Sequence, residues 1–115
     1  MKITKIFSDV NGESHFEDLE IPLVDQGEIG FLSEGIDVKK LQFRKVPADY
    51  DYDFHCAPQK QYIVLLDGGV VIETSLGEKR VFETGEILLV EDISGKGHKT
   101  KNTEKKERTS LFIHI

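Results

Sequence analysis

Short runs of apolar residues, separated by turn-forming sequences, set the pattern of this chain. The clearest series is QYIVLLDGGVVIETSLGEKRVFETGEILLVED, residues 61–92, in which DGG, SLGEK and Gly85 divide the apolar runs. Runs rich in Val, Ile and Leu with glycine-containing turns between them are typical of β-strands. We therefore predict strands at 62–66, 70–74, 81–85 and 86–92.

Three further segments have the same character: HFEDLEIPL (15–23), VKKLQFRKV (38–46) and TSLFIHI (109–115). No stretch longer than about ten residues keeps the i, i+3, i+4 apolar spacing of a surface helix. The segment PLVDQGEIGFLSEGI (22–36) contains three glycines, and we expect a loop that crosses the mouth of a barrel. The pattern predicts a single all-β domain, either a sandwich or a barrel.

Composition narrows the class of protein further. A chain of 115 residues has room for one core, and 38% hydrophobic with 31% charged residues is typical of a soluble globular domain. There is no run of about 18 apolar residues, and the start MKITKIFSDVNGESHF lacks the features of a secretory signal. Cys56 is the only cysteine, which excludes an internal disulfide. We expect a cytoplasmic protein in which this thiol is buried and unreactive.

The net charge of −6 is unevenly distributed. Residues 96–115 carry six basic and two acidic side chains, whereas residues 1–53 carry six basic and twelve acidic ones. The basic stretch KGHKTKNTEKKER contains no aromatic residue, which is unlike a single-stranded nucleic-acid site. We interpret it as a solvated hairpin, because exposed lysines protect strand edges from aggregation. Neither a nucleic-acid nor a membrane partner is expected.

The segment FHCAPQKQYIVLLDGG and the later GEILLVEDISGKGHKTKN resemble the two sequence motifs of the cupins, which are jelly-roll β-barrels. The first motif has the form G-x5-H-x-H-x3,4-E-x6-G, and the second has the form G-x5-P-x-G-x2-H-x3-N. The matching residues are His55, Gln61 and Gly68 in the first motif, and Gly85, His98 and Asn102 in the second. The resemblance implies a double-stranded β-helix, or jelly-roll barrel, with a motif-bearing core at about 46–102 and an N-terminal strand arm at 1–30.

This chain departs from both motifs. Asp49 stands at the first glycine, Ala57 replaces the second histidine, and Gln61 replaces the glutamate. In the second motif Glu91 stands where proline is expected, and the spacing from Gly85 to the histidine is two residues longer.

In metal-binding cupins these motif positions hold iron, manganese, nickel, copper or zinc. The resemblance therefore implies one divalent transition metal bound by His55, Gln61 and His98, and a small polar substrate for oxygenase, isomerase or lyase chemistry. The set has no anionic ligand, and a neutral amide binds a divalent ion less strongly than a carboxylate. The alternative is a metal-free barrel that binds a small ligand or serves mainly for dimerisation, and a homodimer is the family expectation.

Several other residues are candidates for a site. Arg44 and Tyr52 could line the cavity, one binding an anion and the other donating a hydroxyl hydrogen bond, and a position at the surface is an equal alternative for each. We expect His15 and His114 at the surface. We interpret the loop containing Glu91, Asp92 and Lys96 as an exposed turn, because it includes Gly95 and Gly97.

Overall fold

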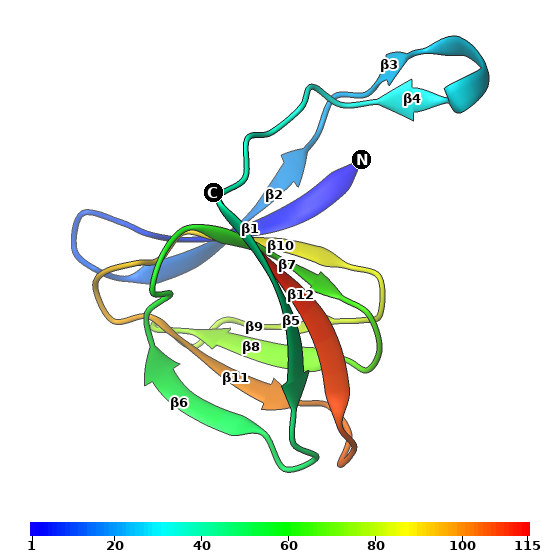
Figure 1. Cartoon of the computed structure of the whole chain (residues 1–115). Coiled ribbons are helices and arrows are strands. Elements are labelled where there is room, and N and C mark those ends of the chain that lie inside the picture. The colour runs from blue at the N-terminus through cyan, green and yellow to red at the C-terminus, as the bar shows by residue number, and fades with distance from the viewer.

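Two β-sheets face each other and enclose the interior of a barrel (Figure 1). The computed structural model describes all residues, 1–115. The larger sheet has six strands, in the order β2 (Ser14–Glu20), β1 (Lys2–Ser8), β10 (Ile87–Val90), β7 (Gln61–Leu65), β12 (Arg108–His114) and β5 (Lys40–Val46). The smaller sheet has four, in the order β6 (Asp51–His55), β11 (His98–Asn102), β8 (Val70–Thr74) and β9 (Lys79–Phe82).

All neighbouring strands in these sheets are antiparallel except β1 and β10, which are parallel. From β5 onward the chain passes repeatedly between the two sheets, as it does in a jelly roll. The predicted all-β jelly-roll barrel is thus confirmed, and the strands expected in the 61–92 segment are present as β7 to β10.

The core lies between the sheets and receives side chains from both. It contains Ile6 from β1, Leu65 from β7, Ile72 from β8 and Leu88 from β10, each no more than 2% exposed. Strand side chains alternate between faces, so these residues point inward and their sequence neighbours point outward. Leu65, Ile72 and Leu88 also line the cavity described below.

The segment predicted to cross the barrel mouth instead projects away from the barrel (Figure 1). It forms a small hairpin from β3 (Val24–Asp25) and β4 (Phe31–Leu32), joined by a 3-10 helix at Gly27–Ile29. The mouth-crossing prediction is therefore wrong. Within the N-terminal segment expected as an arm, residues 2–20 form two strands of the larger sheet. No helix in the chain is long and apolar enough to cross a membrane.

Candidate functional site

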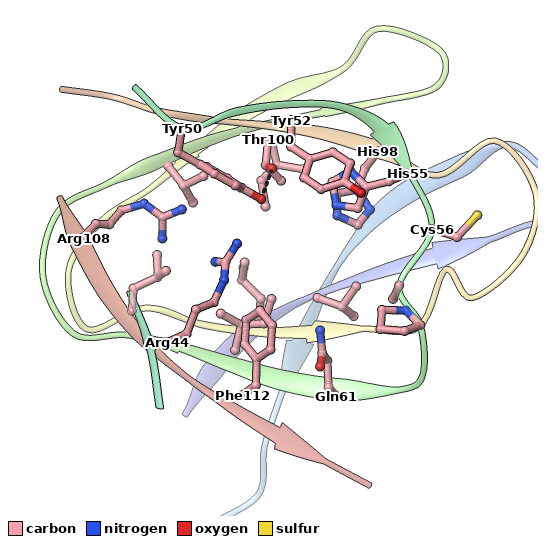
Figure 2. A pocket seen from close by; sticks show the side chains of 18 residues that line it. Arg44, Tyr50, Tyr52, His55, Cys56, Gln61, His98, Thr100, Arg108 and Phe112 are labelled. Carbon is pink, nitrogen blue, oxygen red and sulfur yellow. Dashed lines mark hydrogen bonds between the residues drawn. The ribbon is translucent and has the colours of Figure 1, made fainter. Parts of the chain in front are cut away.

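A cavity of about 350 Å³ lies inside the barrel and is lined from both sheets (Figure 2). Eleven of its 18 lining residues are hydrophobic. No aspartate or glutamate is among the 18. The polar side chains gather in two groups, which Figure 2 shows at different ends of the cavity. We call them the histidine end, with His55, His98 and Gln61, and the arginine end, with Arg44 and Arg108.

The two histidines come from neighbouring strands of the smaller sheet. His55 ends β6 and His98 begins β11, and the two residues are directly paired in the strand register. Their ring centroids lie 4.6 Å apart. Strand pairing therefore places both imidazoles on the same side of the sheet, facing the cavity.

Hydrogen bonds at Nδ1 orient both rings. Nδ1 of His55 lies 2.8 Å from the carbonyl oxygen of Asp53, and Nδ1 of His98 lies 2.5 Å from Oδ2 of Asp92. When Nδ1 carries the donated proton, the neutral ring keeps its lone pair on Nε2. Burial is the main cause that lowers the pKa of His55, and the hydrogen bond to Asp53 partly opposes it. His55 is therefore a neutral imidazole near pH 7.

Asp92 lies behind His98 as seen from the cavity. The Asp92 side chain is fully buried and that of His98 is 5% exposed. The prediction of an exposed turn is wrong for Asp92, because its carboxylate faces inward to accept the proton of His98. The prediction is correct for Lys96, which is exposed and pairs with Glu13. Glu91 is partly exposed and pairs with Lys5 and Lys60.

Gln61 begins β7 and reaches the cavity from the opposite sheet (Figure 2). The residue is 4% exposed, and its Oε1 is buried without a hydrogen-bond partner. Buried polar atoms almost always have a partner, and an exception is a sign of an absent ion, water or ligand. The structure thus places all three residues of the predicted metal set around one cavity.

The arginine end contains two guanidinium groups stacked on aromatic rings. Cζ of Arg44 lies 5.0 Å from the ring centroid of Tyr50 and 4.8 Å from that of Phe112. Cζ of Arg108 lies 5.6 Å from the same Tyr50 ring. Figure 2 shows both guanidinium groups turned into the cavity.

Asn102 fixes the direction of Arg108. Nε of Arg108 donates to Oδ1 of Asn102 at 2.8 Å, and the Asn102 amide nitrogen donates to the carbonyl oxygen of Pro47 at 3.0 Å. Gly68 leaves the necessary room, because a Cβ there would lie 3.3 Å from Cβ of Arg108. Two residues matched to the cupin motifs therefore position an arginine that those motifs do not include.

Gly97 brings the loop before His98 against β6. A Cβ at this position would lie 2.1 Å from the carbonyl oxygen of His55, and the residue has a φ of 71°. Only glycine permits both this approach and this backbone conformation. Ser14 holds the same loop by donating to the carbonyl oxygen of Gly97 at 2.6 Å.

Other histidine and cysteine positions differ in part from expectation. His114 is buried and contacts Gln59, so its predicted surface position is wrong. His15 is partly exposed and lies 2.7 Å from Asp9. Cys56 is half-buried instead of fully buried, and its thiol donates to the carbonyl oxygen of Gly95 at 3.2 Å.

Sequence reasoning left Arg44 and Tyr52 undecided, and both line the cavity. It missed Arg108, which looked like part of a solvated basic hairpin but is 3% exposed. It also missed Tyr50 and Thr100, whose hydroxyl groups lie 3.1 Å apart at the cavity wall. Period-two alternation in RTSLFIH was the available signal, since it places Arg108 on the same face as Ser110 and Phe112.

Comparison with known proteins supports the fold. The cupin domain of Cnp3 from Schizosaccharomyces pombe is similar over 99% of this chain and 83% of its own, with a TM-score of 0.51 and 12% identity. Protein NMB1881 from Neisseria meningitidis is similar over 84% of this chain and 83% of its own, with a TM-score of 0.48 and 11% identity. The capsular polysaccharide assembling protein CapF from Staphylococcus aureus matches over 82% of this chain and 29% of its own, with a TM-score of 0.48 and 11% identity.

No protein-family model matches the chain, and no curated protein matches its sequence. At these identities the similarity concerns the fold alone. The protein has a jelly-roll barrel fold similar to that of the Cnp3 cupin domain, as the resemblance to the two cupin motifs implied.

The residues at the histidine end fit a divalent metal ion in three respects. Each imidazole has its Nδ1 engaged elsewhere, a carboxylate lies behind His98, and the oxygen of Gln61 lacks a partner. A carboxylate behind a ligating histidine is the usual arrangement around protein-bound metals. No group of three or more His, Cys, Asp or Glu side chains is placed to hold a metal ion, so an ion bound to the two histidines would need the Gln61 amide or water as a further ligand.

Proposed function

We propose that this cupin-type barrel binds a divalent transition metal at the histidine end and a small polar molecule in the cavity beside it. The observation that carries this proposal is the pair of imidazoles at the cavity wall, each with its Nδ1 bound to a protein oxygen, which share the cavity with Gln61 of the opposite sheet. His55 and His98 would supply nitrogen ligands, and Gln61 an oxygen ligand. Asp92 would hold His98 in the orientation that binding requires.

A bound ion would act as a Lewis acid that polarises an oxygen atom of the substrate. The residues around it supply the other requirements of a binding site. The lining is mostly apolar, and the hydroxyl groups of Tyr50 and Thr100 offer hydrogen bonds. The cavity volume, near the lower end for ligand sites, suits a small molecule.

Metal-free ligand binding is the second candidate function. The absence of any carboxylate from the cavity lining favours it, because a divalent charge would be left uncompensated by the protein. In that case Gln61, His55 and His98 would hydrogen-bond directly to the ligand. The two candidates differ in whether the protein takes up metal at this site.

Titration of the metal-free protein with Co²⁺, followed by visible absorption, tests the proposal. We expect saturation at one ion per chain, loss of the signal in His55→Ala and His98→Ala, and an unchanged titration in the control His15→Ala. Gln61→Glu should bind more tightly, because a carboxylate replaces the amide ligand. No uptake by the wild type, or undiminished uptake by His98→Ala, would exclude the metal site.

A further inference from the structure

The arginine end of the cavity has an unbalanced positive charge. Arg44 and Arg108 both stack on Tyr50, so two cations approach each other inside the barrel. No carboxylate lines the cavity, and the only hydrogen bond of the Arg108 guanidinium inside the chain is the one from Nε to Asn102. A guanidinium has five N–H donors, so most of those on Arg108 remain available.

The surroundings make these charges unfavourable without a partner. Arg108 is 3% exposed, and burial followed by the charge of Arg44 lowers its pKa. Buried charges in proteins are normally paired, because desolvation is otherwise uncompensated. Asn102, held by backbone carbonyls, nevertheless keeps Arg108 in place. Asp67 partly offsets the charge of Arg108, but it accepts a hydrogen bond from the Thr109 amide and does not line the cavity. The guanidinium groups at this end therefore have no anionic partner inside the cavity.

Between the two polar ends the cavity is apolar. Ile63 and Leu65 of β7, Ile72 of β8, and Leu88 and Val90 of β10 form this part of the wall. A ligand that fills the cavity must present an apolar body to these side chains. Guanidinium groups bind carboxylates through paired hydrogen bonds of matching geometry.

We propose that Arg44 and Arg108 form a clamp for the carboxylate of a small organic acid whose apolar body extends toward the histidine end. This inference rests on the proposed function only in placing the ligand in the same cavity, and it requires no metal. The histidine end does not specify the class of ligand, whereas the two arginines specify a carboxylic acid.

Calorimetric titration of the full-length, chelator-treated protein tests the clamp. The probes are hexanoate, its neutral counterpart 1-hexanol, and inorganic phosphate. We expect hexanoate to bind and to raise the melting temperature, and the other two to have no effect. Arg44→Met should weaken hexanoate binding about ten- to a hundredfold, because the charged hydrogen bonds from Arg44 to the carboxylate are lost. Lys45→Met is the control, because Lys45 is adjacent to Arg44 but points to the opposite face of β5. This variant should bind hexanoate as the wild type does.

A second readout separates the clamp from a structural role. Without ligand, Arg44→Met should melt at a higher temperature than the wild type, because the repulsion between the arginines is removed. Failure of hexanoate to bind, preference for phosphate, or binding only after metal is added would each overturn the clamp. The Co²⁺ titration is unaffected by these results, so failure of the clamp and of the metal site are distinguishable.

Discussion

The imidazole of His98 and the carboxylate of Asp92 lie 2.5 Å apart, and both side chains are almost completely buried. Oδ2 of Asp92 is hydrogen-bonded to Nδ1 of His98, whereas Oδ1 of Asp92 has no hydrogen-bond partner. Burial of an incompletely paired carboxylate is unfavourable. We therefore infer that Asp92 serves to orient the imidazole of His98.

Asp92→Asn should therefore weaken metal binding without abolishing it. The amide keeps the shape of the side chain but removes the charge that orients His98, and such changes reduce metal affinity about 10- to 100-fold. Competition with a chelating indicator measures the effect. Glu91→Gln is the control, since Glu91 pairs only with lysines at the surface. Equal affinity in Asp92→Asn and wild type would show that Asp92 does not act through His98.

Gly97→Ala should destabilise the protein and disturb the histidine pair. The new Cβ would lie 2.1 Å from the carbonyl oxygen of His55. Strained backbone conformations cost about 1–3 kcal/mol, and the collision adds to this cost. Gly77→Ala is a matched control, because Gly77 also has a positive φ but no atom within 4 Å of its Cβ position. Urea unfolding of both variants should give a larger loss for Gly97→Ala, and equal losses would contradict the structure.

Ile6→Ala tests the position of β1 in the sheet. Ile6 is fully buried, and truncation of a buried isoleucine costs about 2–5 kcal/mol. Val10→Ala, in the exposed turn that follows β1, should have almost no effect on unfolding by urea. A loss below about 1 kcal/mol for Ile6→Ala would place this strand outside the core.

Glu13 should stabilise the protein in a pH-dependent manner. Hydrogen bonds from Lys96 and Ser75 lower its pKa below the ordinary value of 4.5. The unfolded state then binds more protons at acidic pH, so this stabilisation is present above pH 4.5 and is lost as pH falls through the lowered pKa. Unfolding by urea at a series of pH values should show Glu13→Gln less stable than wild type at pH 7, with the difference shrinking below pH 4.5. A difference independent of pH would contradict this assignment.

The strands that follow a period of two were predictable from the sequence, as were the two motif histidines. β1 was not, because its buried residues Ile3 and Ile6 are three positions apart and give no alternation. His114 was placed at the surface on the assumption that Leu111 and Ile113 face the core. Those residues instead lie on the outer face of the larger sheet, since Phe112 between them lines the cavity, and His114 is buried.

The charged residues of the site could not be predicted for a different reason. Asp92 and Arg108 lie in segments whose other charged residues are exposed or partly exposed, and local composition does not distinguish them. Asp92 is paired with His98 and Arg108 with Asn102, each six positions away across a turn, and Arg108 also stacks on Tyr50, which comes from a separate segment. Only the fold brings these groups together.

The metal content of the protein tests the central claim most directly. Elemental analysis should be made on protein prepared without affinity tag or chelator, together with His55→Ala and His98→Ala. A metal site at the histidine end predicts about one transition-metal ion per chain in the wild type and none in either variant. A wild type that contains no metal, and takes up none when divalent ions are added to the folded protein, would contradict it.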